Sequence, residues 1–359
     1  MQKNSKIYVA GHTGLVGSAI WKNLLSKGYT NLIGRTIEEL DLMNTVAVRE
    51  FFDAEQPEYV ILAAAKVGGI VANNIYRADF IYQNLQIQNN VINESFRHNV
   101  KKLLFLGSTC IYPRDAQQPM SETELLTAPL EYTNEPYAIA KIAGLKMCES
   151  FNIQYGTNFI AVMPTNLYGP NDNFDLEKSH VLPAMIRKIY LADCLKKGEW
   201  QAICRDFDLR PVENINGSAD KEIIVQKLEK YGIFADRVEL WGSGKPLREF
   251  LWSEEMADAS VFIMENVDFQ NLISAAQNSE IRNCHINIGT GKEISIKELS
   301  ELVKQTVDYQ GDIVFDSTKP DGTMRKLTDV SKLHSLGWHH KIEIEEGVKK
   351  MFEWYVFRS

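Results

Sequence analysis

Short apolar runs alternate with segments in which apolar residues recur at helical spacing. Residues 6–10, KIYVA, predict a buried strand, and the segment 11–27 carries Val16, Ile20 and Leu24 on one helical face. Strands that alternate with helices imply right-handed crossovers and a parallel sheet, so we expect an α/β domain with a doubly wound, Rossmann-type sheet. Further strands are predicted at 31–33, 59–65, 103–106 and 159–163, with helices at 45–52, 79–98 and 136–155.

The pattern changes after Asn166. We therefore expect a first domain over 1–180, completed by segments near 242–290, and a smaller mixed α/β domain over 181–359. An insertion near 193–236 is polar and rich in turn residues, although its end carries an amphipathic helix. The predicted helices are 181–192, 218–232, 253–265 and one after Ser295, and the predicted strands are 237–240 and 285–289.

Composition excludes several classes of protein. The net charge of -8 over 359 residues argues against broad nucleic-acid binding, which requires a basic surface. No uncharged apolar run is long enough for a membrane helix, and the glycines near the N-terminus interrupt any signal-like segment, so we expect a cytoplasmic protein. The five cysteines are widely spaced without a C-x-x-C pair, which supports neither a disulfide framework nor a metal site.

The segment AGHTGLVG places three glycines, Gly11, Gly14 and Gly17, directly after the first predicted strand. Glycine allows a tight turn and lets the start of a helix approach a pyrophosphate. Glycines are common at helix starts, and this spacing differs from G-x-G-x-x-G. The glycine segment nevertheless lies at the first strand-helix junction, and this position predicts a dinucleotide-binding site.

Arg35 follows the second predicted strand, where an arginine accommodates the 2'-phosphate of NADPH and an acidic residue would bind the ribose of NADH. This position predicts NADPH as the cofactor. Arg35 can also be an ordinary solvated loop residue, because Glu38 and Glu39 lie close by in sequence. Asp41 can accept a hydrogen bond from the adenine amine.

Tyr137 and Lys141 are spaced i and i+4 on a predicted helix, so their side chains share one face. A lysine beside a phenol favours the ionised phenol and is expected to lower its pKa from about 10. The pattern Y-x-x-x-K is common by chance. Here it follows a nucleotide turn and Ser108 at a strand end, which is the order found in Ser-Tyr-Lys reductases.

Longer motifs indicate which family of enzymes the chain resembles. The chain resembles the extended short-chain dehydrogenases/reductases and, among them, the GDP-L-fucose synthase family, through segments that extend over nearly its whole length. These segments are GHTGLVGSAI, AAAKVGGIVANN, FIYQN, GSTCIYP, NEPYAIAKIAG, MPTNLYGPNDNF, SHVLPAMIRK, WGSGKPLREF and KPDGTMRKL.

The resemblance implies epimerisation at carbons 3 and 5 of GDP-4-keto-6-deoxy-D-mannose, followed by reduction at carbon 4 with NADPH. It assigns Cys110 as the base and His180 as the acid, and it assigns Ser108 and Tyr137 to the carbonyl oxygen. Tyr137 would also donate the proton during reduction, and Lys141 would bind the nicotinamide ribose. Without the resemblance, Cys110 would be interpreted as a buried apolar thiol and His180 as a surface or helix-start residue.

The resemblance also implies sets of binding residues. Isolated arginines and tryptophans of this kind are otherwise typical of surface ion pairs or of the core. The cofactor set is Gly11, His12, Thr13, Gly14, Leu15, Val16, Gly17, Arg35, Asp41, Lys141, Pro164, Asn166, Leu167 and His180. The set for the GDP-sugar substrate is Asn166, Arg187, Lys188, Trp241, Arg248, Asp321 and Lys326.

Two departures from the family pattern limit these expectations. Thr13 and Ile37 stand where some relatives carry arginines, so the preference for NADPH would rest mainly on Arg35. The insertion near 193–236 matches no catalytic segment; it is either a surface decoration or a lid or subunit contact.

Three further expectations complete the interpretation. The resemblance implies a homodimer formed through the helices that follow Asp79 and Pro136. Another nucleotide-sugar enzyme, such as a dehydratase or a 4-epimerase, remains an alternative. A catalytically silent NADP-binding regulatory protein is the alternative from a different class, although the Ser-Tyr-Lys set is complete in this sequence.

Overall fold

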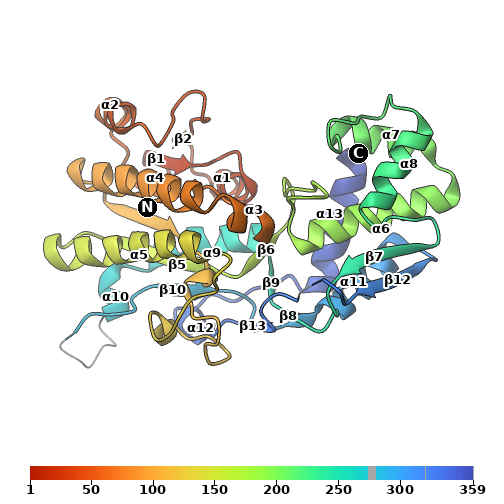
Figure 1. Ribbon diagram of the computed structural model, residues 1–359. Coiled ribbons are helices and arrows are strands. Elements are labelled where there is room, and N and C mark those ends of the chain that lie inside the picture. Colours follow the sequence, from red (N-terminus) through yellow and green to blue (C-terminus); the bar gives the residue numbers. More distant parts are fainter. Residues whose placement is uncertain (274–279, 320, 359) are drawn as a thin grey trace. The chain divides into compact units, whose positions relative to one another are not determined.

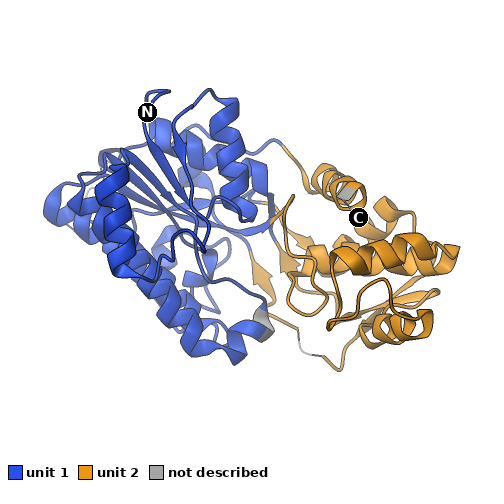
Figure 2. Cartoon of the chain, turned by 90° about the horizontal axis from the view of Figure 1, so that it is seen from above, with its two compact units in different colours: residues 1–167, 249–291, 327–341 blue, residues 168–248, 292–326, 342–359 orange. Residues whose placement is uncertain are grey.

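The protein is described by a computed structural model that covers residues 1–273, 280–319 and 321–358. The chain forms two compact units (Figure 2). The segment 168–180, which we expected in the first domain, belongs to unit 2, and the segment 327–341 belongs to unit 1. Unit 1 comprises residues 1–167, 249–291 and 327–341, and unit 2 comprises residues 168–248, 292–326 and 342–359.

Unit 1 is built on a six-stranded sheet in the order β10-β5-β4-β3-β1-β2 (Figure 1). Every pair of neighbouring strands in this sheet is parallel. The expected doubly wound sheet is thus confirmed. Its strands are β1 (Ile7–Ala10), β2 (Leu32–Ile33), β3 (Tyr59–Leu62), β4 (Lys102–Leu106), β5 (Phe159–Pro164) and β10 (Ile286–Ile288).

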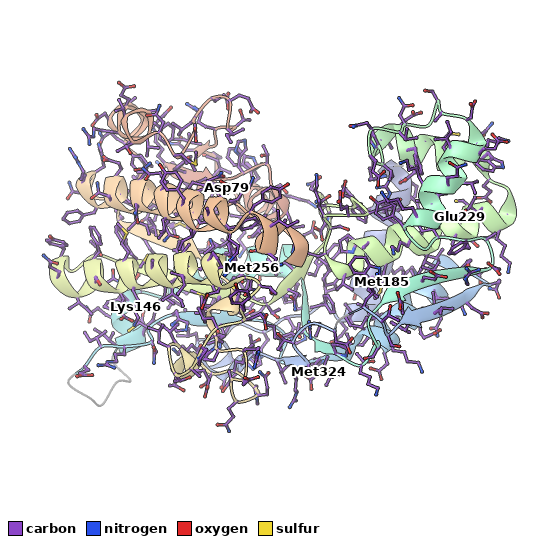
Figure 3. The ribbon with its side chains drawn as sticks, viewed as in Figure 1. Asp79, Lys146, Met185, Glu229, Met256 and Met324 are labelled. Carbon is purple, nitrogen blue, oxygen red and sulfur yellow. The ribbon has the colours of Figure 1, made fainter. Side chains whose placement is uncertain are left out.

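Helices cover both faces of this sheet because successive side chains of a strand point to opposite sides. Tyr8 and Ala10 of β1 pack in one core cluster with α2, α4 and α5, whereas Ile7 and Val9 pack in the other with α1 and α9. Met256 of α9, labelled in Figure 3, is fully buried in this second cluster. The helices are α1 (Leu15–Ser26), α2 (Thr45–Glu55), α3 (Ile70–Ile75), α4 (Arg77–Arg97), α5 (Glu135–Tyr155), α9 (Ser253–Asn266), α10 (Phe269–Ile273) and α12 (Ser331–Ser335).

Short elements connect this framework to the loops that carry the candidate site. Two 3-10 turns, η1 (Thr109–Ile111) and η2 (Glu122–Glu124), lie between β4 and α5. The strands β6 (Asn166–Tyr168) and β9 (Phe250–Trp252) pair with each other. No helix among the described residues combines the length and the apolar character that a membrane crossing requires.

Unit 2 is a mixed α/β unit with two small sheets. β7 and β12 pair in parallel, while β8 pairs antiparallel to β11 and parallel to β13. The strands are β7 (Arg237–Trp241), β8 (Leu247–Arg248), β11 (Ile294–Ser295), β12 (Asp312–Asp316) and β13 (Arg325–Lys326). The helices are α6 (Val181–Lys197), α7 (Trp200–Leu209), α8 (Lys221–Lys230), α11 (Ile296–Val307) and α13 (Ile344–Arg358).

The insertion forms α7 and α8 and is not merely a surface decoration. Ile203 and Phe207 of α7 and Ile224 and Leu228 of α8 are fully buried. Asp206 lies on the same buried side of α7 and has no exposed surface. We did not predict α7, because the segment around it is rich in turn residues. The apolar residues of α7 nevertheless follow helical spacing.

A buried carboxylate, that of Glu249, ties together the segments at which the chain enters and leaves unit 1. Its Oε1 accepts hydrogen bonds from the backbone N–H groups of Thr290 (2.6 Å) and Gly291 (2.7 Å). Its Oε2 accepts from the N–H (2.9 Å) and the hydroxyl (2.5 Å) of Thr328, and its backbone carbonyl accepts from the Asn166 amide (2.7 Å). An ionised carboxylate is an acceptor only, so it suits a position that faces N–H and O–H donors on both sides.

We expect Glu249→Gln to destabilise the protein, because the new amide NH₂ must point at backbone or hydroxyl donors on one of the two sides. The free energy of unfolding in urea should fall by roughly 2–3 kcal/mol. Glu254→Gln is the matched control, since Glu254 is only partly buried and forms a surface ion pair with Lys22, and it should cost less than about 1 kcal/mol. Equal effects of the two substitutions would contradict the role given to Glu249.

Candidate active site

The three glycines form a tight turn between β1 and α1. Gly11 has φ +81, and a Cβ at this position would lie 2.8 Å from the backbone nitrogen of Ala64. A Cβ at Gly17 would lie 2.0 Å from the carbonyl oxygen of Gly11. Gly14 precedes α1, and no side chain of the described residues caps the helix. The turn therefore presents backbone N–H groups at a helix N-terminus, which suits a diphosphate.

Two other residues of the expected cofactor set lie near this turn. The Nδ1 atom of His12 is buried without a hydrogen-bond partner among the described residues. Its ring occupies the space beside Gly34, where a Cβ would lie 2.5 Å from the imidazole. Arg35 forms an ion pair of 2.6 Å with Glu55, so a 2'-phosphate would share or replace this partner. The buried polar atom and the glycine turn both fit a bound dinucleotide.

The remaining cofactor candidates occupy the same edge of the sheet or the turn itself. Asp41 lies after β2 and accepts a hydrogen bond from the backbone of Met43 at 2.9 Å. Asn166 lies just beyond the end of β5 and is exposed. Its side-chain amide donates a hydrogen bond to the backbone carbonyl of Glu249. The glycine turn and α1 contain Thr13, Leu15 and Val16, and the end of β5 and the start of β6 contain Pro164 and Leu167.

Ser108 and Cys110 lie at the carboxyl end of β4. The backbone N–H of Gly107 donates to Val162 of β5 at 2.8 Å, so the pairing of the two strands extends to the residue before Ser108. The Ser108 hydroxyl accepts from the backbone N–H of Cys110 at 3.3 Å and caps η1. Cys110 is buried, with 7% of its surface exposed.

Tyr137 and Lys141 on α5 approach the same strand end. The Lys141 ammonium donates to the carbonyl of Leu106 at 2.8 Å and lies 5.7 Å from the centre of the Tyr137 ring. Both side chains interact electrostatically with Cys110. The structure thus brings together four of the five expected catalytic residues, all within unit 1.

The electrostatics of this pair differ from the sequence expectation. Burial lowers the pKa of Lys141 to about 8. Burial also raises the pKa of Tyr137 well above its usual range, and the nearby Cys110 raises it further. The expected lowering of the phenol pKa by Lys141 is therefore wrong for this state of the protein, because desolvation of the phenolate dominates. Tyr137 is held in its protonated form.

His180, the fifth catalytic candidate, belongs to unit 2 and stands directly before α6. Its side chain reaches the surface, yet desolvation by the surrounding protein lowers its pKa. About two turns further along α6, Lys188 is buried and donates to the carbonyl of Glu239 at 3.2 Å. Burial lowers the pKa of Lys188 to about 8.

The other substrate candidates of unit 2 gather at the ends of β7, β8 and β13. Arg248 and Lys326 are paired neighbours in the β8–β13 ladder. Asp321 interacts with Arg248, and its carboxylate accepts from the backbone N–H (2.8 Å) and hydroxyl (2.7 Å) of Ser243. Trp241 leaves 65% of its surface exposed beside this group. The Lys319 ammonium lies 5.6 Å from the centre of the Trp241 ring. An exposed indole can stack on a nucleotide base, and cations such as Arg248 and Lys326 suit a diphosphate.

Arg187 does not fit the role that the resemblance implied. It has no exposed surface, and its guanidinium forms an ion pair of 2.8 Å with Asp206 of α7. Its remaining donors bond to the carbonyls of Phe174 (3.1 Å) and Arg210 (2.5 Å). We correct the expectation accordingly: this geometry supports a structural role for Arg187, and Lys188 beside it remains the substrate candidate.

Sequence reasoning missed Glu249, although a signal was present. An acidic residue between Arg248 and the apolar stretch FLW interrupts a buried strand pattern. A buried charge of this kind requires several hydrogen-bond partners.

Comparisons with known proteins show the family of this chain. Residues 7–207 match the family described as NAD dependent epimerase/dehydratase. The chain belongs to this family. It is 46% identical to GDP-L-fucose synthase of Escherichia coli (strain K12) over 98% of this chain and 96% of that protein. It is 50% identical to putative GDP-L-fucose synthase 2 of Arabidopsis thaliana over 99% of this chain and 93% of that protein. The resemblance noted in the sequence is confirmed.

A solved structure extends the comparison. MlghC, a GDP-mannoheptose C4 reductase from Campylobacter jejuni with NADP bound, is 48% identical to this family member and has a TM-score of 0.86. The match covers 99% of each chain.

The titration of Lys141 gives a testable pH dependence. Because burial lowers its pKa from 10.5 to about 8, the unfolded chain retains a proton that the folded protein releases above pH 8. Wild-type stability should therefore gain up to ~1.4 kcal/mol per pH unit between pH 8 and 10 from this group. Lys141→Met lacks this proton, so its stability relative to wild type should fall as the pH rises.

Urea unfolding at several pH values measures this difference. Lys349→Met, at an exposed position of α13, serves as the control and should track the wild type. A stability difference for Lys141→Met that stays constant from pH 8 to 10 would show that Lys141 does not titrate there.

Proposed function

We propose that this protein catalyses the NADPH-dependent 3,5-epimerisation and 4-reduction of GDP-4-keto-6-deoxy-D-mannose to GDP-L-fucose. The convergence of Ser108, Cys110, Tyr137 and Lys141 at the carboxyl end of β4 carries the proposal. The identity of 46–50% with GDP-L-fucose synthases over nearly the whole chain supports it. These residues provide the oxygen-binding pair, Ser108 and Tyr137, and the base, Cys110.

Epimerisation requires removal of the acidic hydrogens beside the 4-keto group. We assign Cys110 as the base and His180 as the acid that returns a proton to the opposite face. The charge that develops on the carbonyl oxygen is stabilised by hydrogen bonds from the hydroxyls of Ser108 and Tyr137. Tyr137 remains protonated through this step because its burial disfavours the phenolate.

Reduction uses the same oxygen-binding pair. NADPH, when bound, supplies the hydride to carbon 4. Tyr137 donates its proton to the oxygen, while Lys141 holds the nicotinamide ribose and its positive charge favours the tyrosinate that results. The glycine turn and Arg35 would hold the pyrophosphate and the 2'-phosphate.

The GDP moiety is assigned to unit 2 in this proposal. Arg248 and Lys326 provide positive charge for the diphosphate, and Lys188 adds a third cation. Trp241 offers an exposed indole for stacking, and Asp321 orients Arg248. Asn166 is assigned to the sugar.

A homodimer forms part of the proposal. Helices α4 and α5 pack against each other, and each presents large apolar side chains to solvent. Tyr82 of α4 and Ile153 and Tyr155 of α5 leave more than half of their surface exposed. Exposed aromatic and aliphatic groups on paired helices suit burial against a second copy.

A cytoplasmic location is also proposed, on the basis of the widely spaced cysteines in the sequence.

A second candidate function is reduction of a GDP-4-keto-heptose. It is favoured by MlghC, a GDP-mannoheptose C4 reductase, which matches this chain over 99% of both lengths. The two functions differ in the sugar, which is a 6-deoxyhexose in one and a seven-carbon sugar in the other. They share the cofactor and the reduction at carbon 4.

Incubation of the purified enzyme with NADPH and each keto sugar tests the proposal. We expect GDP-L-fucose to form with the loss of one NADPH per product, measured by absorbance, with product stereochemistry measured by NMR. A product reduced at carbon 4 with the original configuration at carbons 3 and 5 would refute the epimerase activity. Turnover of the heptose alone would favour the second candidate.

Cys110→Ser should separate the two halves of the reaction. A serine hydroxyl is much less acidic than a thiol, so solvent-deuterium incorporation at carbons 3 and 5 should fall at least about 100-fold. The dissociation constant for NADPH should not change. Cys204→Ser, in α7, is the matched control and should exchange at the wild-type rate. Undiminished exchange in Cys110→Ser would remove the thiol from the mechanism.

A further inference from the structure

A buried polar network lies behind the turn that carries Cys110. Tyr112 follows η1 directly, and only 2% of its surface is exposed. Its hydroxyl lies 3.0 Å from Nε2 of His285 and 2.5 Å from Oδ1 of Asn287. Neither His285, which is 2% exposed, nor Asn287, which is 0% exposed, is part of the proposed mechanism.

The surrounding carbonyls fix the direction of these hydrogen bonds. The amide nitrogen of Asn287 donates to the carbonyls of Met120 (3.0 Å) and Asp329 (3.2 Å), so its oxygen must face Tyr112. Tyr112 uses its one hydroxyl hydrogen to donate to that oxygen. The Tyr112 oxygen then accepts from His285, which must carry its hydrogen on Nε2.

The state of His285 agrees with this assignment. Its Nδ1 is buried without a hydrogen-bond partner among the described residues. Burial lowers the pKa of His285 well below its usual value, and the charges of Lys332 and Lys146 lower it further. His285 is therefore neutral, with one ring hydrogen, and it serves as a fixed donor to Tyr112.

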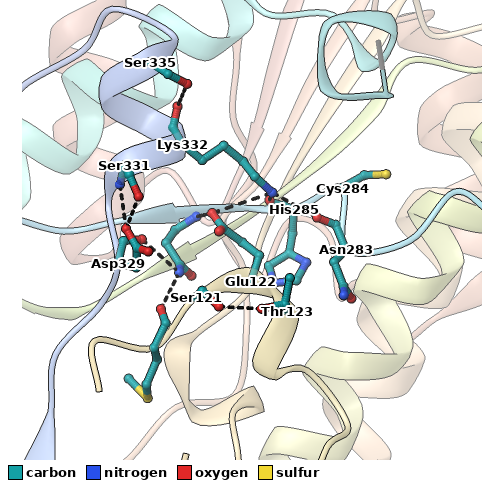
Figure 4. Close-up of polar contacts among 12 residues, drawn as sticks. Ser121, Glu122, Thr123, Asn283, Cys284, His285, Asp329, Ser331, Lys332 and Ser335 are labelled. Atoms are coloured by element: carbon teal, nitrogen blue, oxygen red, sulfur yellow. Dashed lines mark hydrogen bonds and ion pairs between the residues drawn. The ribbon is translucent and has the colours of Figure 1, made fainter. Parts of the chain in front are cut away.

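A second set of contacts holds the network in place (Figure 4). The backbone N–H of Asn287 donates to the Glu122 carboxylate at 3.0 Å. The Lys332 ammonium lies 3.8 Å from the same carboxylate and donates to the carbonyls of His285 (2.9 Å) and Asn283 (3.0 Å). Three segments far apart in sequence, around 120, 285 and 330, thus support the Tyr112 hydroxyl.

Ser108 and Cys110 are fixed by different parts of the structure. Gly107, next to Ser108, is bonded to β5, so the main sheet holds Ser108. Cys110 lies within η1, where Ser108 caps one end and Tyr112 forms the other. A change in the anchoring of Tyr112 should therefore displace the thiol more than the serine hydroxyl.

We infer that Tyr112, anchored by His285 and Asn287, is a positioning residue that aims the Cys110 thiol for proton transfer. This inference rests on the proposed function, in which Cys110 serves the epimerisation alone. The network then controls the ratio of epimerisation to reduction. A purely structural role would reduce both activities together.

The test compares the two half-reactions in Tyr112→Phe, which keeps the buried ring and removes only the hydroxyl. Epimerisation is followed as solvent-deuterium incorporation at carbons 3 and 5. The carbon-4 step is followed separately as the initial rate of GDP-L-fucose oxidation by NADP⁺. We expect deuterium incorporation to fall about 10- to 100-fold, and oxidation to fall less than about threefold, because a small misplacement of a reacting group has a large effect on its rate.

Tyr29→Phe is the matched control. Tyr29 is equally buried in unit 1, and its hydroxyl donates to Glu265 at 2.6 Å, away from the turn. This variant should leave the ratio of the two rates unchanged. Rates are divided by the fraction of protein that binds NADPH, so that partial unfolding does not imitate a change in ratio.

A measurement without substrate keeps the inference testable on its own. The alkylation rate of Cys110 by iodoacetamide, followed by mass spectrometry of its peptide, should change several-fold in Tyr112→Phe and stay constant in Tyr29→Phe. An unchanged ratio of rates together with unchanged alkylation would overturn the inference. Absence of exchange in the wild-type enzyme would instead refute the proposed function.

Discussion

The Glu249 carboxylate is the interaction on which the arrangement of unit 1 most depends. Its two carboxylate oxygens accept hydrogen bonds from the backbone N–H groups of Thr290 and Thr328, which lie in two separate segments. The backbone carbonyl of Glu249 accepts a hydrogen bond from Asn166, in a third segment. Asn166 lies in one of these segments, Lys326 is close to another, and Arg248 directly precedes Glu249 itself. One buried negative charge thus holds together segments that carry or adjoin three of the proposed binding residues. Its desolvation is offset by donors fixed in direction, which is the condition under which buried charges are tolerated.

The candidate catalytic group illustrates a second constraint. The half-buried Tyr137 lies beside the buried Lys141, and desolvation moves the pKa of each group in the direction that favours its neutral form. Tyr137 therefore keeps its proton, and Lys141 loses its proton more readily than a lysine in water does. The charge of bound cofactor and substrate would then alter this balance during turnover.

Much of the fold could be predicted from the sequence because its signals are local. Apolar runs such as KIYVA and the helical spacing of Val16, Ile20 and Leu24 define strands and helices without knowledge of their neighbours. The motifs around Ser108 and Tyr137 gave the candidate site for the same reason. Glu249 and Tyr112 escaped notice because their importance depends on donors more than 35 residues away in sequence.

The pKa of Tyr137 and the environment of Arg187 show a further limit of sequence reasoning. The i, i+4 spacing places Lys141 beside the phenol, but it does not report how far both groups are removed from water. Motif position likewise assigned Arg187 to the nucleotide, whereas Asp206, from an insertion without a recognised motif, and two backbone carbonyls occupy its guanidinium. Burial and partners arise from tertiary structure, and they can override a role suggested by position.

The Arg187–Asp206 pair bears on how this protein can be altered. Asp206 also accepts hydrogen bonds from Arg210 and from Tyr355 of α13, so the inserted helix is joined to the body of unit 2 through a fully buried charge. Removal of one partner from such a pair leaves the other charge uncompensated in the interior. The insertion is therefore not a detachable module. A chimera that shortens this chain must replace Arg187 together with the segment, because the guanidinium would otherwise lose its buried carboxylate partner.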